Sequence, residues 1–152
     1  MAQLTTYSAK NVNFCLQHPL AAGPIQAAGV FAKGVNSYSI RMGVEHANLQ
    51  VAADGAIVPS WTPGEWGDIE ISMYQTSTLH QEFLALYNAV KAAADAGDTS
   101  RAFAGTVVLL NVVDGSVHTG TGVSFQKVPD KAYGAQSAVL NWVLRCANLE
   151  NE

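Results

Sequence analysis

Apolar and polar residues alternate along much of this chain, which is the pattern of β-strands with one buried face. The clearest run extends from Gly67 to Tyr74, and its two faces separate cleanly into Ile69, Ile71 and Met73 on one side and Asp68, Glu70 and Ser72 on the other. Further strands are predicted at Val12–Gln17, Gly29–Phe31 with its flanks, Val35–Gly43, Gly105–Val113, Val117–Lys127 and Val139–Ala147. The pattern therefore predicts a mainly β protein.

One segment, from Leu79 to about Ala96, has helical periodicity instead. Its apolar residues follow the spacing of a single stripe: Leu79, Phe83, Leu86, Tyr87 and Val90. Thr78 and Gln81 have the spacing of a capping box, and Gly97 supplies a stop. Since strands flank the helix on both sides, it is expected to lie across a sheet or to plug the end of a barrel, with its stripe packed in the core.

Two local features mark turns and irregularities in the last three strands. Asp114-Gly115 lies between two β-prone runs, where a type I′ turn needs positive φ at both central residues, so it predicts a hairpin. Gly120 and Gly122 lack the downstream glycine and helix of a phosphate cradle, and they predict a close backbone approach or a bulge. Gln126–Gly134 contains Pro129 and has no hydrophobic period, so we expect an ordered loop there.

The long stretch from Val44 to Trp66 shows little periodicity, with a turn at Ala53-Asp54-Gly55. A segment of this length inside a compact domain is usually functional or binds a partner. Trp61 and Trp66 are therefore either anchors at an interface or caps on the end of the core.

Composition limits the function classes. The 152 residues predict one domain, and 49% hydrophobic against 13% charged residues excludes a disordered chain. A surface so poor in charge suits permanent contacts with other subunits, although an ordinary β protein with a polar surface fits too. The net charge is −4 and the basic residues are scattered, which argues against tight DNA binding. With no export signal or membrane-spanning run, we expect an aqueous compartment.

No constellation for catalysis is apparent, so we predict that the protein is not an enzyme and has no catalytic, cofactor or metal site. The four histidines lie on separate predicted elements without metal-ligand spacing: His18, His46, His80 and His118. Cys15 and Cys146 fall on strand faces of different character, which favours reduced thiols over an intrachain bridge. A bridge between subunits through Cys15 is the remaining alternative.

Three islands, in order along nearly the whole chain, resemble the tail tube proteins of contractile-tailed bacteriophages. They are Tyr7–Val12, Met73–Ser77, and Ser124–Lys127 leading into Pro129-Asp130 and Tyr133-Gly134. The resemblance implies an antiparallel β-sandwich or flattened barrel with one flanking helix. It also implies hexameric rings whose inner sheets join into one large barrel, and which stack through a long loop into the inner tube for DNA ejection.

The resemblance also implies roles for particular regions. Val35–Gly43 and Gly67–Tyr74 are expected to line the lumen, where Asp68 and Glu70 would repel DNA phosphates; a solvated strand face is the alternative, and the pair has poor geometry for catalysis. The helix is expected to face a sheath. The expected inter-ring loop, at about 44–66, includes Glu45, His46, Trp61, Glu65 and Trp66. The expected subunit contacts in the last loop are Lys127, Asp130 and Tyr133.

The partners implied are further copies of the chain, the tail sheath, baseplate and tail-terminator proteins, and DNA that passes without specific binding. No cofactor and no membrane insertion are implied, and the location is the virion tail after synthesis in the host bacterial cytoplasm. Two other functions stay open: a tube ring protein of a related contractile injection or secretion system, and a monomeric β-barrel that binds a small ligand.

Overall fold

The computed structural model describes residues 11–28, 32–112 and 115–152. Seven strands form one antiparallel sheet in the order β2-β1-β7-β8-β9-β6-β3, and two more form a separate hairpin, β4-β5. The strands are β1 (Val12–Gln17), β2 (Ile25–Ala28), β3 (Val35–Met42), β4 (Ala47–Val51), β5 (Ile57–Trp61), β6 (Gly67–Tyr74), β7 (Gly105–Asn111), β8 (Val117–Phe125) and β9 (Val139–Asn151). The helices are α1 (Thr78–Asp95), the short α2 (Thr99–Ala102) and a 3₁₀ turn, η2 (Ala32–Gly34).

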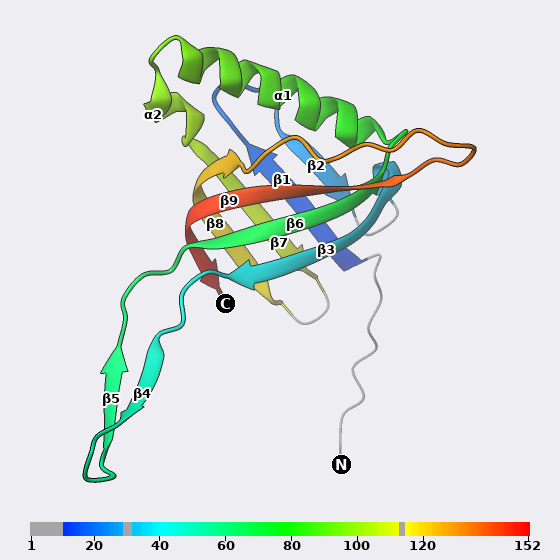
Figure 1. The fold of residues 1–152 in the computed structure, drawn as a ribbon. Coiled ribbons are helices and arrows are strands. Elements are labelled where there is room, and N and C mark those ends of the chain that lie inside the picture. Colours follow the sequence, from blue (N-terminus) through cyan, green and yellow to red (C-terminus); the bar gives the residue numbers. More distant parts are fainter. Residues whose placement is uncertain (1–10, 29–31, 113–114) are drawn as a thin grey trace.

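The large sheet curls into a half-barrel, and α1 lies across its open side (Figure 1). The prediction of a mainly β fold of the flattened-barrel kind with one main helix is confirmed. β2 and β3 are the two edges of the sheet, and each is hydrogen-bonded to only one neighbouring strand within the described residues. The curl of the sheet brings β1, the neighbour of the edge strand β2, close to the other edge across the core, because the Phe14 ring of β1 stacks on Tyr38 of β3 at 5.8 Å.

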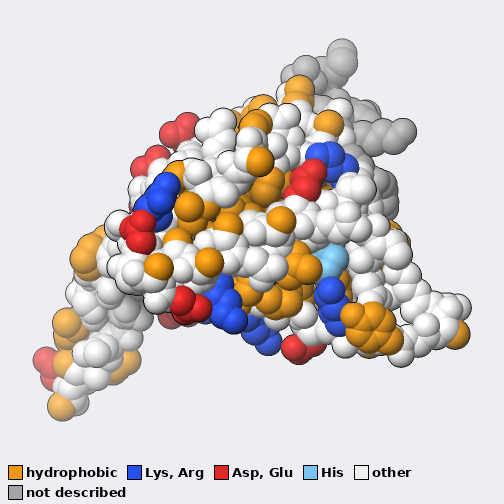
Figure 2. All heavy atoms as spheres, turned by 90° about the horizontal axis from the view of Figure 1, so that it is seen from above, with side chains coloured by type: hydrophobic (Ala, Val, Ile, Leu, Met, Phe, Trp, Pro, Cys, Tyr) orange, Lys and Arg blue, Asp and Glu red, His pale blue; other side chains and the backbone are white. Residues whose placement is uncertain are grey.

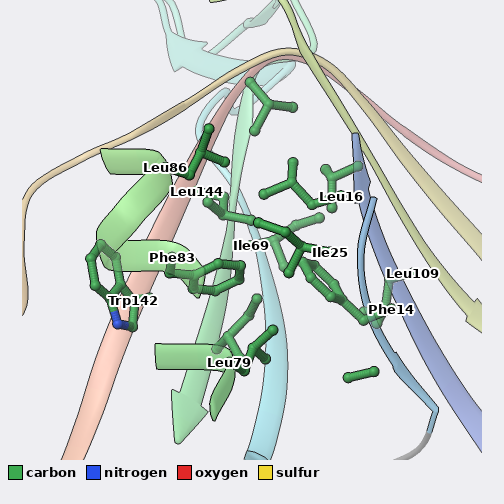
Figure 3. Close-up of a cluster of buried hydrophobic side chains, with 14 of the residues drawn as sticks. Phe14, Leu16, Ile25, Ile69, Leu79, Phe83, Leu86, Leu109, Trp142 and Leu144 are labelled. Carbon is green, nitrogen blue, oxygen red and sulfur yellow. The ribbon is translucent and has the colours of Figure 1, made fainter. Parts of the chain in front are cut away.

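The core lies between the concave face of the sheet and α1. The alternation predicted for β6 is confirmed, since Ile69, Ile71 and Met73 are fully buried. Phe83 of α1 makes edge contacts with Trp142 at 5.7 Å and Phe14 at 6.0 Å, joining opposite sides of the half-barrel (Figure 3). Burying aromatic and aliphatic side chains in this way supplies most of the driving force for closing the sheet under the helix.

The apolar stripe of α1 packs in the core as predicted, but the helix begins differently. Ser77, not Thr78, is the N-cap: its Oγ accepts a hydrogen bond from the Leu79 N–H at 3.1 Å. The predicted capping box is therefore wrong, because Thr78 is already inside the first turn. The Ser77 hydroxyl also donates to the backbone carbonyl of Lys33, which ties the helix start to η2. Gly97, with φ 90°, ends the helix as predicted.

Several strand boundaries differ from the predictions. The predicted strand at Gly29–Phe31 lies outside the described residues, and the strand in that region is the preceding β2. β9 continues to Asn151 instead of ending at Ala147, because the alternation persists and Leu149 is again fully buried. The hairpin between β7 and β8 is present. Asp114 of its turn lies outside the described residues, whereas Gly115 has the expected positive φ of 76°.

The two glycines of β8 serve both purposes expected of them. Gly122, with φ 64°, is the extra residue of a bulge, since Gly105 pairs with Val123 but Thr106 pairs with Thr121. Gly120 permits a close approach: a Cβ there would lie 2.5 Å from Cys146 Sγ. These glycines let β8 bend into the half-barrel and let β9 pack against it.

Candidate functional site: a projecting hairpin and a charged sheet face

The stretch predicted as a long loop is a two-stranded hairpin that projects away from the sheet, at the end opposite α1 (Figure 1). Its turn is where the sequence predicts it: Gly55 has φ 86°, and its N–H donates to Ala52 O at 2.9 Å. The hydrophobic pattern of the sequence does not predict these two strands, because they are short and Pro59 interrupts β5. A proline is tolerated in a two-stranded ribbon, because one edge of each strand faces solvent and has no partner strand to which an N–H must donate.

One face of this hairpin is entirely apolar. Cross-strand pairing brings three pairs of its residues together on that face: Ala47 with Trp61, Leu49 with Pro59, and Val51 with Ile57. The opposite face carries Asn48, Ser60, Gln50 and Val58. Of the apolar face, Leu49, Val51, Ile57 and Trp61 are between 56% and 72% exposed. We call these six residues the apolar face of the hairpin.

The side chain of Trp61 is held in place although it is exposed. Its ring stacks on His46 with centroids 4.7 Å apart and planes 10° apart. His46 is fixed in turn, because its Nδ1–H donates to Thr62 O at 2.8 Å. The Thr62 N–H donates back to His46 O, also at 2.8 Å, and closes the base of the hairpin. Trp61 is thus presented to solvent in a defined orientation.

Trp66 lies at the junction between the hairpin and the sheet, away from the projecting strand that carries Trp61. Its ring covers Gly43, where a Cβ would lie only 2.3 Å from the ring, and Arg145 lies over it at 6.0 Å. Nearby, Glu65 is exposed and its carbonyl accepts from Leu149 N–H at 2.6 Å, while Glu45 is exposed as well. Of the two predicted tryptophan anchors, only Trp61 lies on the projecting strands.

The outer face of β3, β6 and β9 carries paired charges. Asp68 and Glu70 both lie on this face, and each carboxylate is close to an arginine. Arg145 Nε lies 3.5 Å from Asp68 Oδ1, and Arg41 Nη2 lies 3.5 Å from Glu70 Oε2. The two carboxylates are therefore balanced by two arginines. The sequence alone does not predict these arginine partners, because the register that brings three strands together is not visible in any one strand.

The predicted contact residues of the last loop are all at the surface. Lys127 Nζ and Asp130 Oδ2 form a long ion pair of 4.0 Å, and Tyr133 is 84% exposed. An exposed pair of this kind contributes little to stability. A cleft of about 360 Å³ separates Lys127 and Asp130 from the charged face, where Arg41 and Glu70 line it.

The two cysteines are free and lie in different environments. Cys15 is half-buried on the outer side of β1, whereas Cys146 is buried, and burial together with the Asp68 charge raises its thiol pKa to about 12. A thiol with so high a pKa is unreactive at neutral pH.

Two histidines are buried and serve the fold. His80 Nδ1 accepts a hydrogen bond from the Trp142 indole at 3.0 Å, and His18 Nδ1 accepts one from Leu20 N–H at 3.1 Å. Burial lowers the pKa of both. Within the described residues no three His, Cys, Asp or Glu side chains come together as a metal site. Across the same residues, no helix has the length and apolar character to cross a membrane.

Comparison with known proteins gives one family and a set of similar folds. The family model described as "Bacteriophage PhiTE tail tube protein" matches residues 4–152. The tube-terminating cap structure of the anti-feeding prophage matches with 10% identity and a TM-score of 0.55, covering 100% of this chain and 94% of that one. A chain of the anti-feeding prophage baseplate matches with 11% identity and a TM-score of 0.54, covering 99% and 97%. At these identities the two structures show the fold alone. No curated protein matches.

Proposed function

Because this chain belongs to the family of the bacteriophage PhiTE tail tube protein, we propose that its copies close into hexameric rings and stack into the inner tube of a contractile tail, through which DNA is ejected. Membership of this family makes the protein a structural component of the virion tail and not an enzyme. Its synthesis in the host bacterial cytoplasm is part of the same proposal.

The observation that carries the proposal is the apolar face of the hairpin. An isolated two-stranded hairpin is marginally stable in water, and a contiguous exposed apolar surface usually marks an interface. This hairpin projects beyond the sheet, so, apart from the stack of Trp61 on His46, its apolar face lacks a covering partner among the described residues of its own chain. Another copy supplies that partner in a stack. Because the hairpin and α1 lie at opposite ends, contacts between those ends repeat in one direction and build a tube.

Ring closure concerns the two sheet edges. Among the described residues β2 and β3 are open edges, and pairing or covering them between neighbouring copies removes the unpaired backbone groups that otherwise invite aggregation. In this arrangement β3 and β6 line the lumen, α1 faces the sheath, and the exposed residues Lys127, Asp130 and Tyr133 meet a neighbouring subunit. The tail sheath, baseplate and tail-terminator proteins are the further partners, and DNA passes without specific binding.

The second candidate function is the tube of a related contractile injection system. The folds of two anti-feeding prophage components favour it. Recovery of the chain from DNA-filled virions would separate the two functions. The third alternative, a ligand-binding barrel, has less support, because core side chains and α1 fill the concave side of the described sheet.

The assembly proposal is tested by electron microscopy of the purified chain and of a shortened variant. The wild-type protein is expected to form tubes of uniform bore. In the variant, a two-residue Asn-Gly turn replaces residues 47–61, since His46 and Thr62 are already hydrogen-bonded across the base. This variant is expected to form rings that do not stack.

A matched control replaces Asn48 and Ser60, on the polar face of the hairpin, by threonine, and it should still form tubes. Circular dichroism should show an intact fold in both variants. A wild-type protein that stays monomeric at high concentration, or a shortened variant that still forms tubes, would contradict the proposal.

A further inference from the structure

An apolar pocket lies at the end of the molecule opposite the hairpin. It is formed where the turn after β1 meets α1, and its volume is about 400 Å³. Leu20, Pro24, Ile25 and Leu86 are among its lining residues. Figure 2 looks onto this side of the molecule and shows hydrophobic side chains between the charged ones on the surface. The pocket is thus large and apolar enough to accept an aromatic side chain from outside.

Among the described residues, Glu82 is the one charged residue that lines this pocket. Its Oε1 lies 3.6 Å from Lys33 Nζ, in an ion pair at the surface. Its second oxygen, Oε2, is buried and accepts no hydrogen bond from the described residues. The Glu82 side chain as a whole is 42% exposed, so its carboxylate gives the pocket one acceptor that a group from outside can reach. A ligand matched to this pocket carries one hydrogen-bond donor on an otherwise apolar body.

Trp61 at the other end of the molecule has this chemistry. An indole is an apolar body with a single N–H donor and no acceptor. Trp61 is 70% exposed, yet the stack on His46 fixes its ring, so little side-chain entropy is lost when it binds. The hairpin strands that carry it have no lysine, arginine, aspartate or glutamate to be buried at the contact.

We propose that the hairpin of one copy docks onto the α1 end of a second copy, with Trp61 in the pocket and its indole N–H donating to the Glu82 carboxylate. This inference rests on the proposed tube and names the surface that receives the hairpin in it. The donor and the receiving pocket lie at opposite ends of the subunit, so the contact leaves a free donor and a free pocket at the two ends of every stack (Figure 1).

Photocross-linking tests the location of the contact. Replacing Trp61 by the photoreactive p-benzoylphenylalanine should cross-link it, in assembled tubes, to residues 20–25 or 82–86 of another copy, as mapped by mass spectrometry. The matched control carries the same group at Gln50, on the polar face of the hairpin, and should not cross-link there. Tubes whose position-61 cross-links map elsewhere would overturn this inference and leave the tube proposal standing, whereas a wild-type chain that never assembles would overturn both.

Filling the pocket from within the same chain is an independent test. Ala85 is exposed on α1 and lines the pocket, so Ala85→Trp should block docking without disturbing the core. Rings without tubes are expected. Ala92→Trp is the control, because Ala92 is also exposed on α1 but does not line the pocket, and it should form tubes. Tube formation by Ala85→Trp would rule out the pocket as the receiving surface.

The hydrogen bond itself is tested by a double-mutant cycle on the protein concentration needed for tube growth. Trp61→Phe keeps the aromatic ring and removes the donor, so this concentration should rise roughly tenfold. In an Glu82→Ala background the same change should have little further effect, because the acceptor is already absent. Equal effects of Trp61→Phe in both backgrounds would show that Trp61 does not donate to Glu82.

Discussion

At the scale of single residues, buried polar side chains orient the elements of this fold. The Trp142 indole donates to His80 Nδ1, which fixes α1 over β9. His18 is used twice: its Nδ1 accepts from Leu20 N–H, and its Nε2 lies 3.4 Å from Ala102 O as the donor. Each ring works as a neutral imidazole with an accepting Nδ1. Protonation of Nδ1 would turn this acceptor into a donor. It would then face the N–H group that now donates to it, and the hydrogen bond would be lost.

This protonation predicts a loss of stability in acid. Burial, with a smaller contribution from Lys131, lowers the pKa of His80 below its ordinary value of 6.5. Below pH 6.5 the unfolded chain takes up a proton that the folded chain resists, so the stability present above pH 6.5 falls as the pH drops toward the lowered folded pKa. The melting temperature should therefore be lower at pH 5 than at pH 7.

His80→Gln is the matched variant for this test, because an amide oxygen can accept from Trp142 without titrating. The melting temperature of this variant should fall less between pH 7 and pH 5 than that of the wild type. It should still fall, because His18 also titrates. An equal loss in both proteins would show that His80 is not responsible.

At the scale of elements, alternation along the chain predicts those strands that bury one face, as in β6 and β9. It does not predict β4 and β5, because a hairpin without a core beneath it has no buried face to impose a pattern over its short strands. The pairing of Arg41 and Arg145 with the carboxylates of β6 depends on strand order, which local sequence does not contain. The sequence does predict the turn at the tip of the hairpin, where Gly55 has a positive φ, and it misses the pocket formed between β1 and α1.

The close packing of β8 on β9 gives a prediction for Gly120. In Gly120→Ala the new Cβ would lie 2.5 Å from Cys146 Sγ and 2.8 Å from Val107 Cγ1, so overpacking should destabilise the fold by about 1–3 kcal/mol in urea denaturation. Adding Cys146→Ala removes the closest atom, and the double variant should lose less stability than the sum of the two single variants. Strict additivity would mean that the backbone relaxes away from the contact.

At the scale of the whole molecule, the proposed assembly uses different surfaces in different directions. In it, the edges β2 and β3 would make contacts around the ring, and the hairpin and α1 ends would make contacts along the tube (Figure 1). Between the edges, the outer face of β3, β6 and β9 carries two cations balanced by two anions. If this face lines the lumen, balanced charge leaves little net attraction for DNA phosphates, which suits a conduit.

A change of this charge balance tests the lumen proposal in assembled tails. Glu70→Lys with Ser39→Lys, its exposed cross-strand neighbour, adds cations to the face while Asp68 keeps its pairing with Arg145. DNA ejection should become slower, and rising salt should weaken the effect. Exchanging the partners in Arg41→Glu with Glu70→Arg keeps the net charge and should leave ejection unchanged. An unaltered ejection rate in the lysine variant would place this face outside the lumen.

The hairpin has a further consequence for how the subunit folds. β3, β4, β5 and β6 form a ribbon of two separately paired segments, β4–β5 and β3–β6, with the Thr62–His46 and Gly43–Trp66 backbone hydrogen bonds between them, so pairing can start at the Asp54-Gly55 turn and extend toward the sheet. β1, by contrast, pairs with β7 across most of the chain length, which requires the closure of a much larger loop. Topology of this kind favours early formation of the ribbon and late docking of β1. The segment proposed to meet other copies in the tube would then also be the segment from which each copy begins to fold.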